Sequence, residues 1–238
     1  MRLDKFLSEK GIGTRKQIKE YVKNGRATVN GTVAKSSDMH IDENKDEIAF
    51  DGNVLTYSKF YYFMLNKPAD VVSSTRAGKS VTVVDLLKDE GVKDLFPVGR
   101  LDKDTVGLLL LTNDGILAHN LLSPKKHVDK EYEVYLDHEI TDEELHKLEG
   151  GVDIGDEEIT LPARAFRAPD KEGHQVIHLI IHEGRFHQVK RMLNAVDNEV
   201  VFLRRLSMGS LKLDENLAEG EYRPLTEDEI NCLTNSFI

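Results

Sequence analysis

The sequence predicts an α+β protein in two parts: a small N-terminal module with helix–loop–helix and hairpin, then a larger domain with a mixed, largely antiparallel sheet. Three observations support this prediction. A basic segment precedes an acidic body, and the helical and strand-like patterns of the body do not alternate regularly. Apolar residues make up 39% of the chain and charged residues 31%, which is ordinary for a globular protein. We place the boundary so that residues 1–56 form the module and residues 57–238 the larger domain.

The elements of the module follow from local signals. The segment RLDKFL predicts a short helix that ends before Gly11. Thr14 and Gln17 have the spacing of a capping box at the start of a second helix, which Asn24-Gly25 ends. The Asn30-Gly31 pair inside ATVNGTVA predicts a β-hairpin.

Charge is distributed unevenly along the chain. Residues 1–35 carry nine Lys or Arg residues against three acidic ones, a net charge of +6, although the whole chain has −10. Such asymmetry indicates a basic part that faces nucleic acid on an acidic body. A solvated helix face is the alternative, and composition alone does not choose between them. The second helix places its cations largely outside its apolar face: Arg15, Lys16, Lys19 and Lys23.

The larger domain begins after residues 51–60, a polar, turn-rich stretch that predicts a linker. Runs of apolar and β-branched residues then predict five strands, at 61–65, 106–112, 130–136, 175–182 and 199–203. Helical patterns predict three helices, at 83–88, 141–148 and 187–196, the second of them with a capping box.

Several classes of protein are excluded or disfavoured. No run approaches the roughly 18 apolar residues of a membrane span. The N-terminal sequence MRLDKFLSEKG is charged throughout, unlike a signal or transit peptide, so we expect a cytoplasmic protein without membrane contact. The single cysteine, Cys232, excludes an intramolecular disulfide and a Cys-cluster zinc site.

Two motifs suggest a ligand and fail on inspection. SSTRAGKS ends like a phosphate-binding loop, but Ser73 stands where that motif needs glycine. His174, His178 and His182 recur every four residues, yet the β-branched residues of QVIHLIIH predict a strand. Four residues of strand span about 13 Å, too far for two side chains to share one ion. We therefore expect no metal centre and no cofactor.

The loop of residues 97–107 is the strongest candidate for chemistry. It places Arg100, Asp102, Lys103 and Asp104 directly before the apolar run Gly107–Leu111. A loop at the end of a buried strand is a common support for a catalytic carboxylate. A surface loop with a salt bridge explains the same residues, and chemistry alone favours that simpler interpretation.

A resemblance changes that balance. GRLDKDTVGLLLLTNDG closely resembles the signature loop of pseudouridine synthases, in particular the family of the small-subunit rRNA pseudouridine synthase. Further segments follow in the family's order: YFMLNKP, VVSST, SPKKHVDKEYEV, EGRFHQVKRML and EGEYRPLTEDEI. The module, with RLDKFL, TRKQIKEYVKNG and VNG, resembles the RNA-binding module named after the fourth ribosomal protein of the small subunit.

The resemblance implies a role for individual residues. Asp102 matches the family's catalytic carboxylate, Tyr132 the tyrosine that packs against the target base, and Arg185 the basic residue that pairs with the aspartate. Arg100 is expected to bind substrate beside them. A half-buried strand tyrosine and a phosphate-binding arginine are the alternatives for Tyr132 and Arg185. The residues expected on the RNA backbone are Arg15, Lys16, Lys19, Lys23, Arg26, Lys190 and Arg191.

The resemblance also implies an activity, which is the isomerisation of a specific uridine in ribosomal RNA to pseudouridine. The short C-terminal tail favours small-subunit (16S) RNA. Two alternatives remain open at this point: the same reaction on 23S rRNA, and a non-catalytic RNA-binding factor of ribosome assembly. We expect the protein to act as a monomer.

Overall fold

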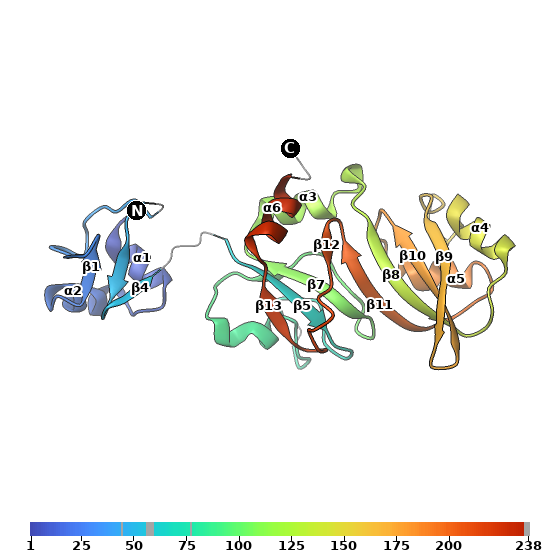
Figure 1. The fold of residues 1–238 in the computed structure, drawn as a ribbon, viewed down its shortest axis with the longest axis horizontal. Helices are drawn as coiled ribbons and strands as arrows, with labels where there is room; N and C mark the ends of the chain where they lie inside the picture. The colour runs from blue at the N-terminus through green and yellow to red at the C-terminus, as the bar shows by residue number, and fades with distance from the viewer. Residues whose placement is uncertain (44, 56–59, 77, 236–238) are drawn as a thin grey trace. The chain divides into compact units, whose positions relative to one another are not determined.

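The structure, a computed structural model, describes residues 1–43, 45–55, 60–76 and 78–235. The chain divides into two compact units, Met1–Lys59 and Phe60–Ile238 (Figure 1). The predicted boundary between residues 56 and 57 falls within 56–59, outside the described residues. Each unit is therefore considered by itself.

The N-terminal unit packs two helices against a small antiparallel sheet. Helix α1 (Leu3–Glu9) and helix α2 (Arg15–Lys23) share a core with strands of the order β2-β1-β3-β4. The strands are β1 (Ala27–Val29), β2 (Thr32–Val33), β3 (Ile48–Phe50) and β4 (Asn53–Leu55). Both local predictions are confirmed, because Thr14 and Gln17 form the capping box and residues 30–31 turn the β1–β2 hairpin. Asn30 and Gly31 adopt the positive φ angles that such a turn requires, 52° and 74°.

The predicted linker at 51–60 is partly wrong. Asp51 and Gly52 turn the chain from β3 into β4, and Asn53 pairs with Phe50 across this hairpin. The turn signals in DGNVLTYSKF therefore connect two strands of one sheet rather than two units. Residues 56–59 of the same stretch lie outside the described residues.

The second unit contains one large sheet of nine strands. Their order is β13-β5-β7-β11-β8-β10-β9, with β12 beside β11 and β6 beside β7. Every pairing is antiparallel except that of β7 with β11, which confirms the predicted mixed, largely antiparallel sheet. The strands are β5 (Tyr62–Lys67), β6 (Phe96–Pro97), β7 (Val106–Thr112), β8 (Lys130–Leu136), β9 (Arg164–Lys171), β10 (His174–Ile181), β11 (Val200–Met208), β12 (Leu211–Lys212) and β13 (Tyr222–Pro224).

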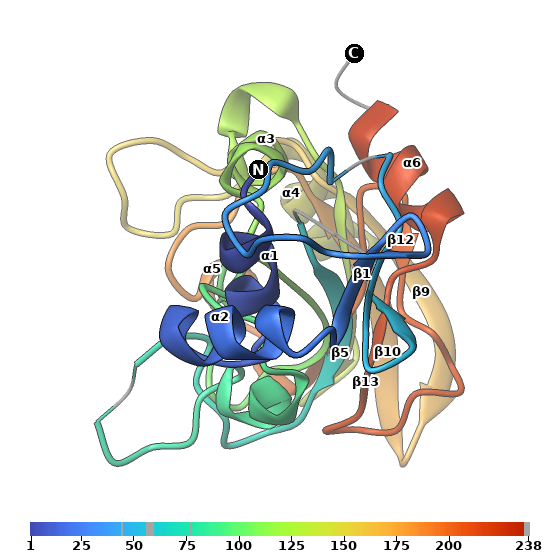
Figure 2. The same ribbon diagram turned by 90° about the vertical axis from the view of Figure 1, so that its left-hand side faces the viewer.

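Helices cover both faces of this sheet. Helix α4 (Asp142–Gly150), helix α5 (Gln188–Asn194) and the 3-10 helix η1 (Asp85–Glu90) contribute to the core on one face. Helix α3 (Gly115–Leu122) and helix α6 (Glu227–Asn235) pack on the other face over β5 and β7 (Figures 1 and 2). A short 3-10 turn, η2 (Pro124–Lys126), links α3 to β8. Because β7 is covered on both sides, all seven of its residues are buried.

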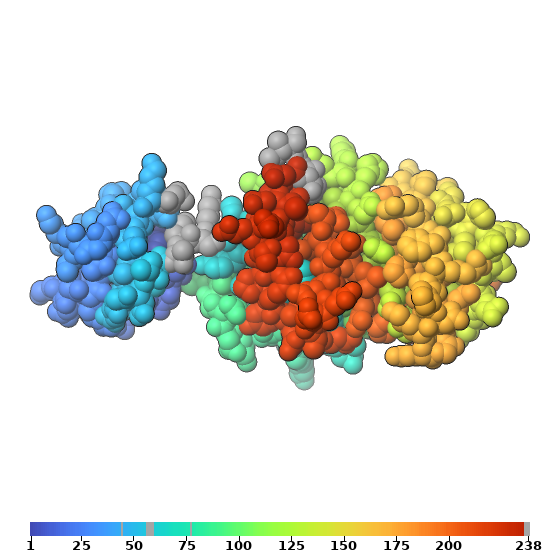
Figure 3. Space-filling view, viewed as in Figure 1, coloured from blue at the N-terminus to red at the C-terminus, as the bar shows by residue number. Residues whose placement is uncertain are grey.

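The C-terminal part of the chain belongs to this unit. Figure 3 shows the C-terminal segment, in red, on the same face of the second unit as the yellow-orange segment that contains β9. Strand β13 pairs with β5, so the two ends of the second unit meet in one sheet. Within the described ranges, no helix combines the length and apolarity that crossing a membrane requires.

Most elements of the second unit were predicted correctly. The strands at 106–112 and 130–136 are confirmed residue for residue, and the three histidines do follow a strand, β10, and its end. The predicted helix at 83–88 is a 3-10 helix that begins two residues later, at Asp85. The predicted strand at 199–203 is too short, because pairing with β8 continues as far as Met208.

Candidate active site

Asp102 lies in the loop between β6 and β7, and buried contacts hold the backbone beside it. The Ser73 hydroxyl donates to the Leu101 carbonyl at 2.9 Å and accepts from the Leu101 N–H at 3.1 Å. The Leu101 side chain is buried in the core of the unit. The leucine thus anchors the loop in the core and leaves the next side chain, that of Asp102, at the protein surface.

A buried lysine holds the other side of the loop. Lys67, which has no exposed surface, donates from Nζ to the carbonyl oxygens of Pro68, Lys103 and Thr105 at 2.9, 3.2 and 2.8 Å. The Thr105 N–H in turn donates to the Asp102 carbonyl at 3.1 Å. Burial lowers the pKa of Lys67 to about 8. One ammonium group therefore fixes the turn that carries Asp102 to the end of β5.

The two carboxylates of the loop have different surroundings. The Asp102 side chain is 27% exposed, with His187 Nε2 at 3.5 Å from Oδ1 and Lys190 Nζ at 3.9 Å from Oδ2. The Asp104 side chain is 72% exposed and accepts from Lys190 Nζ at 2.6 and 2.7 Å. The bond from Lys190 lowers the pKa of Asp104. Asp102 is the more enclosed of the two, and Asp104 is a surface ion-pair partner.

Asp102 opens onto a cavity of about 60 Å³ between the loop, β8 and the start of α5. Tyr132 lies in its wall, 7% exposed, with Leu179 of β10 and Arg205 of β11 as its neighbours across the sheet. Arg100, Arg185 and His187 also line the cavity. Arg100 is exposed and has no ion pair or hydrogen bond within the described ranges. The structure therefore brings together the four residues predicted to act on substrate: Arg100, Asp102, Tyr132 and Arg185.

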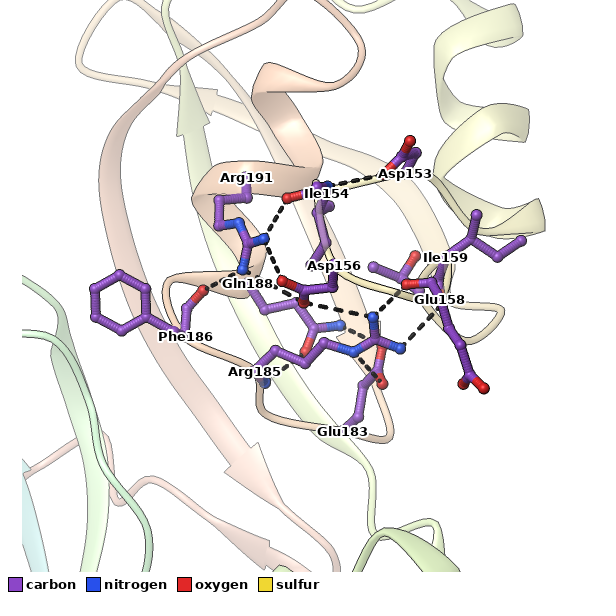
Figure 4. Close-up of polar contacts among 12 residues, drawn as sticks. Asp153, Ile154, Asp156, Glu158, Ile159, Glu183, Arg185, Phe186, Gln188 and Arg191 are labelled. Atoms are coloured by element: carbon purple, nitrogen blue, oxygen red, sulfur yellow. Dashed lines mark hydrogen bonds and ion pairs between the residues drawn. The ribbon is translucent and has the colours of Figure 1, made fainter.

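Within the described ranges, Arg185 and Asp102 form no ion pair, so the expected pairing stays a prediction. Figure 4 shows the partners that Arg185 has instead. Arg185 donates from Nε to Glu183 at 3.0 Å and from its two terminal nitrogens to the carbonyls of Glu158 and Ile159 at 2.6 and 2.9 Å. Asp156 lies 3.5 Å away. These acceptors satisfy the guanidinium, so Arg185 lines the cavity without reaching Asp102.

Arg191 is held by the same segment of the chain. Its guanidinium donates to Asp156 at 2.6 Å, to the Ile154 carbonyl, and to the Phe186 carbonyl at 3.1 Å (Figure 4). The bond from Arg191 lowers the pKa of Asp156. Arg191 and Lys190, both predicted to contact RNA, thus already have carboxylate partners in the folded chain.

The cations predicted on the N-terminal unit fall into two groups. Those of α2, which are Arg15, Lys16, Lys19 and Lys23, are exposed and form no ion pair or side-chain hydrogen bond in the part of the chain that the structure describes. Arg26 is different. Its Nε donates to Asp51 at 2.8 Å, and its guanidinium lies over the rings of Tyr21 and Phe50 at 4.4 and 4.7 Å.

Sequence reasoning missed three residues that shape the site: Lys67, Ser73 and His187. In the sequence, Ser73 stands out because it replaces the glycine that a phosphate-binding loop needs, and Lys67 is only part of the segment YFMLNKP. His187 stands two residues after Arg185 and could have been considered as a neighbour of Asp102. In the described ranges, no three His, Cys, Asp or Glu side chains gather so as to hold a metal ion.

Comparisons with known proteins identify the family of the chain. A family model described as RNA pseudouridylate synthase matches residues 61–195, and one described as S4 domain matches residues 1–47. An RNA pseudouridine synthase of Bacillus subtilis is 51% identical over 98% of both chains. The ribosomal small subunit pseudouridine synthase A of Vibrio cholerae is 40% identical over 97% of this chain and 98% of its own. A crystal structure of a pseudouridylate synthase aligns with a TM-score of 0.67 and 39% identity, over 98% of this chain and 99% of the other.

The chain therefore belongs to the RNA pseudouridine synthase family and carries an S4 domain at its N-terminus. It is an isomerase that converts uridine in RNA to pseudouridine. The resemblance seen in GRLDKDTVGLLLLTNDG and in the N-terminal module is confirmed.

Proposed function

We propose that this protein isomerises a specific uridine of 16S ribosomal RNA and that Asp102 is its catalytic carboxylate. The observation that carries the proposal is the placement of Asp102, on a loop fixed by Lys67 and Ser73, in a cavity shared with Tyr132 and Arg100. Full-length relatives from Vibrio cholerae and Yersinia pestis, named for the ribosomal small subunit, support the choice of RNA. We further propose that it works as a monomer in the cytoplasm.

The reaction needs a carboxylate beside the sugar. It breaks the bond from C1′ to N1 of uridine and forms one from C1′ to C5, so the product is an isomer of the substrate. Asp102 can serve as the nucleophile, at C1′ or at uracil C6, or as the base at C2′. Each route requires an ionised carboxylate held against one nucleotide, and His187 Nε2 and Lys190 Nζ lie 3.5 and 3.9 Å from the Asp102 oxygens.

The target base must leave its stack to reach Asp102. Extrusion costs a few kcal/mol, and stacking on an aromatic ring returns about 1–3 kcal/mol. Tyr132 offers its ring in the wall of the cavity, and Arg100, whose guanidinium has no partner among the described residues, can contact the adjoining phosphate. Arg185, held by Glu183 and residues 158–159, lines the same cavity.

The S4 domain supplies affinity. Four unpaired cations on one short helix suit contacts to phosphates, which position RNA but do not read its sequence. The choice of uridine therefore falls to the second unit and to the shape of the RNA around the target.

The test is direct. Transcripts of 16S and 23S rRNA are incubated separately with the purified protein, and pseudouridines are mapped at nucleotide resolution. We expect one new pseudouridine in the 16S transcript and none in the 23S transcript. Modification of the 23S transcript alone would overturn the assignment to the small subunit. Binding without any pseudouridine in either RNA would favour an assembly factor that does not catalyse.

A further inference from the structure

An exposed aromatic side chain stands at the edge of the active-site cavity and has no part in the mechanism above. Phe186 is 70% exposed and lies between Arg185 and His187, which both line the cavity. Its ring stacks on the imidazole of His187, with centroids 3.8 Å apart and planes inclined by 17°. Because His187 Nε2 is 3.5 Å from Asp102, the stacked pair extends from the catalytic carboxylate to the protein surface.

The backbone holds this ring in place. His187 has a φ of 49°, a left-handed conformation that is uncommon for a residue with a side chain. Arg185 N–H donates to the Gln188 side chain at 2.9 Å, and the Phe186 carbonyl accepts from Arg191 at 3.1 Å. A strained residue that its surroundings keep in place is a signal of function. In Figure 4, the Phe186 ring projects away from the cluster of Arg185 and Asp156.

The chemistry beside the ring indicates what binds to it. One exposed apolar side chain is ordinary on a protein surface, so exposure alone carries no argument. Here the ring stacks on His187, which lines the cavity together with Arg100, and the Arg100 guanidinium has no ion pair or hydrogen bond within the described ranges. An aromatic face and a cation near one cavity match a nucleotide, because its base stacks on the ring while its phosphate meets the cation.

We propose that Phe186 and His187 form a stacking platform for the nucleobase next to the extruded uridine. This inference rests on the proposed function and deepens it. While the target base occupies the cavity, the platform holds the neighbouring nucleotide, next to the gap that the extruded base leaves in the stack. Since every base has an aromatic face, the platform adds affinity at this position without choosing the sequence. Phe186 is therefore a positioning residue that acts through the RNA strand.

The chain offers a matched control. Phe166 on β9 is 46% exposed and its ring lies 5.2 Å from that of His178, so it repeats the pairing of a phenylalanine with a histidine. The histidine partner of Phe166, His178, does not line the active-site cavity, whereas His187, the partner of Phe186, does. Four full-length variants separate the possibilities: Phe186→Ala, Phe186→Trp, Phe186→Leu and Phe166→Ala. Both phenylalanines are exposed, and melting curves verify that each variant folds.

The experiment measures Kd for the 16S and 23S transcripts, and kcat and KM for whichever RNA is modified. We expect Phe186→Ala to raise Kd and KM roughly 5- to 100-fold, the loss of one base–aromatic stack. Phe186→Trp should stay close to the wild type, Phe186→Leu should resemble Phe186→Ala, and Phe166→Ala should leave Kd and KM unchanged.

Wild-type affinity in Phe186→Ala would overturn the proposal, and so would full recovery in Phe186→Leu, which indicates an apolar contact rather than a stack. Kd can be measured without turnover. If the wild type binds RNA but forms no pseudouridine, the proposed function is wrong, and the Kd values of the variants still test the stacking platform. A wild type that binds neither RNA overturns both.

Discussion

The basic side chains of α2 in the S4 domain differ from those around α5 beside the active site in what surrounds them. On α2, four exposed cations have no carboxylate partner within the described ranges. Near α5, Arg185, Lys190 and Arg191 each lie on carboxylates of their own unit. Basic side chains therefore have two roles in this protein. Unpaired cations remain available for phosphates, whereas paired cations hold loops and carboxylates in place.

The two roles predict different effects of salt concentration on RNA binding. Contacts to phosphate release counterions, so an RNA affinity that depends on the α2 cations should fall steeply as salt rises. A cation that already holds a carboxylate releases few counterions when RNA binds. Its removal changes the geometry of the site and therefore the rate. Of the seven cations expected on the RNA backbone, Arg26, Lys190 and Arg191 belong to the paired group.

The largest effect is expected from replacing all four α2 cations by serine. Losing four phosphate contacts should lower affinity at physiological salt roughly 100- to 1000-fold and flatten the plot of log Kd against log salt by about 3. Turnover at saturating RNA should not change. Arg26→Ser is the matched control, because Arg26 is already paired with Asp51. Filter binding at four salt concentrations measures both variants, and an equal loss in the two would abolish the distinction.

A smaller effect, on rate rather than affinity, is expected from Lys190→Met. The Lys190 ammonium lies within 4 Å of both Asp102 and Asp104 and restrains the loop between them. Its removal should lower kcat roughly tenfold, as small displacements of a catalytic group do, and change Kd less than about threefold. Single-turnover kinetics separate the two quantities. A normal kcat with weakened binding would return Lys190 to the group that contacts phosphate.

The smallest effect concerns Lys67, whose buried ammonium donates to three backbone carbonyls. Its pKa of about 8 in the folded protein lies below the value near 10.4 of an unfolded chain. Between these values the unfolded chain binds more protons, so the free energy of unfolding rises with pH. From pH 8 to 10, the free energy of unfolding should rise by roughly 1–2 kcal/mol more in the wild type than in Lys67→Met.

Urea unfolding at several pH values measures this difference. Lys103→Met is the control, because the exposed Lys103 ammonium lies 3.4 Å from Asp70 at the surface and its loss should leave the pH dependence unchanged. Lys130, whose pKa burial also lowers to about 8, is present in all three proteins and cancels. The same pH dependence in Lys67→Met and the wild type would contradict a charged, buried Lys67.

Much of the fold could be predicted because local signals were strong. Thr14 with Gln17 and Asn30 with Gly31 specify their cap and turn within a few residues, and β7 is a continuous apolar run. Strand β9 was missed because RAFRAPDK contains a proline and few β-branched residues, and it forms only by pairing with β10. Helix α6 could have been found, since Thr226 and Glu229 have the spacing of a capping box and are hydrogen bonded.

The site could be predicted less completely, for a physical reason. Arg100, Asp102, Tyr132 and Arg185 come from the quoted segments and line one cavity, but the partners that hold the site come from distant parts of the chain. The acceptors of Arg185 at positions 158 and 159 precede it by more than 25 residues. Lys67 reaches Thr105 across 38 residues. Such pairings depend on the packing of the whole unit, and no local sequence pattern predicts them.

The assignment of Asp102 is tested most directly by comparing Asp102→Asn with Asp104→Asn. Asparagine keeps the shape of aspartate but cannot act as nucleophile or base. Pseudouridine formation is measured in the same 16S transcript with both purified variants, and Kd is measured alongside. We expect Asp102→Asn to form no pseudouridine while binding RNA normally, and Asp104→Asn to lose only part of its rate. Pseudouridine formation by Asp102→Asn at a rate near that of the wild type would contradict this assignment.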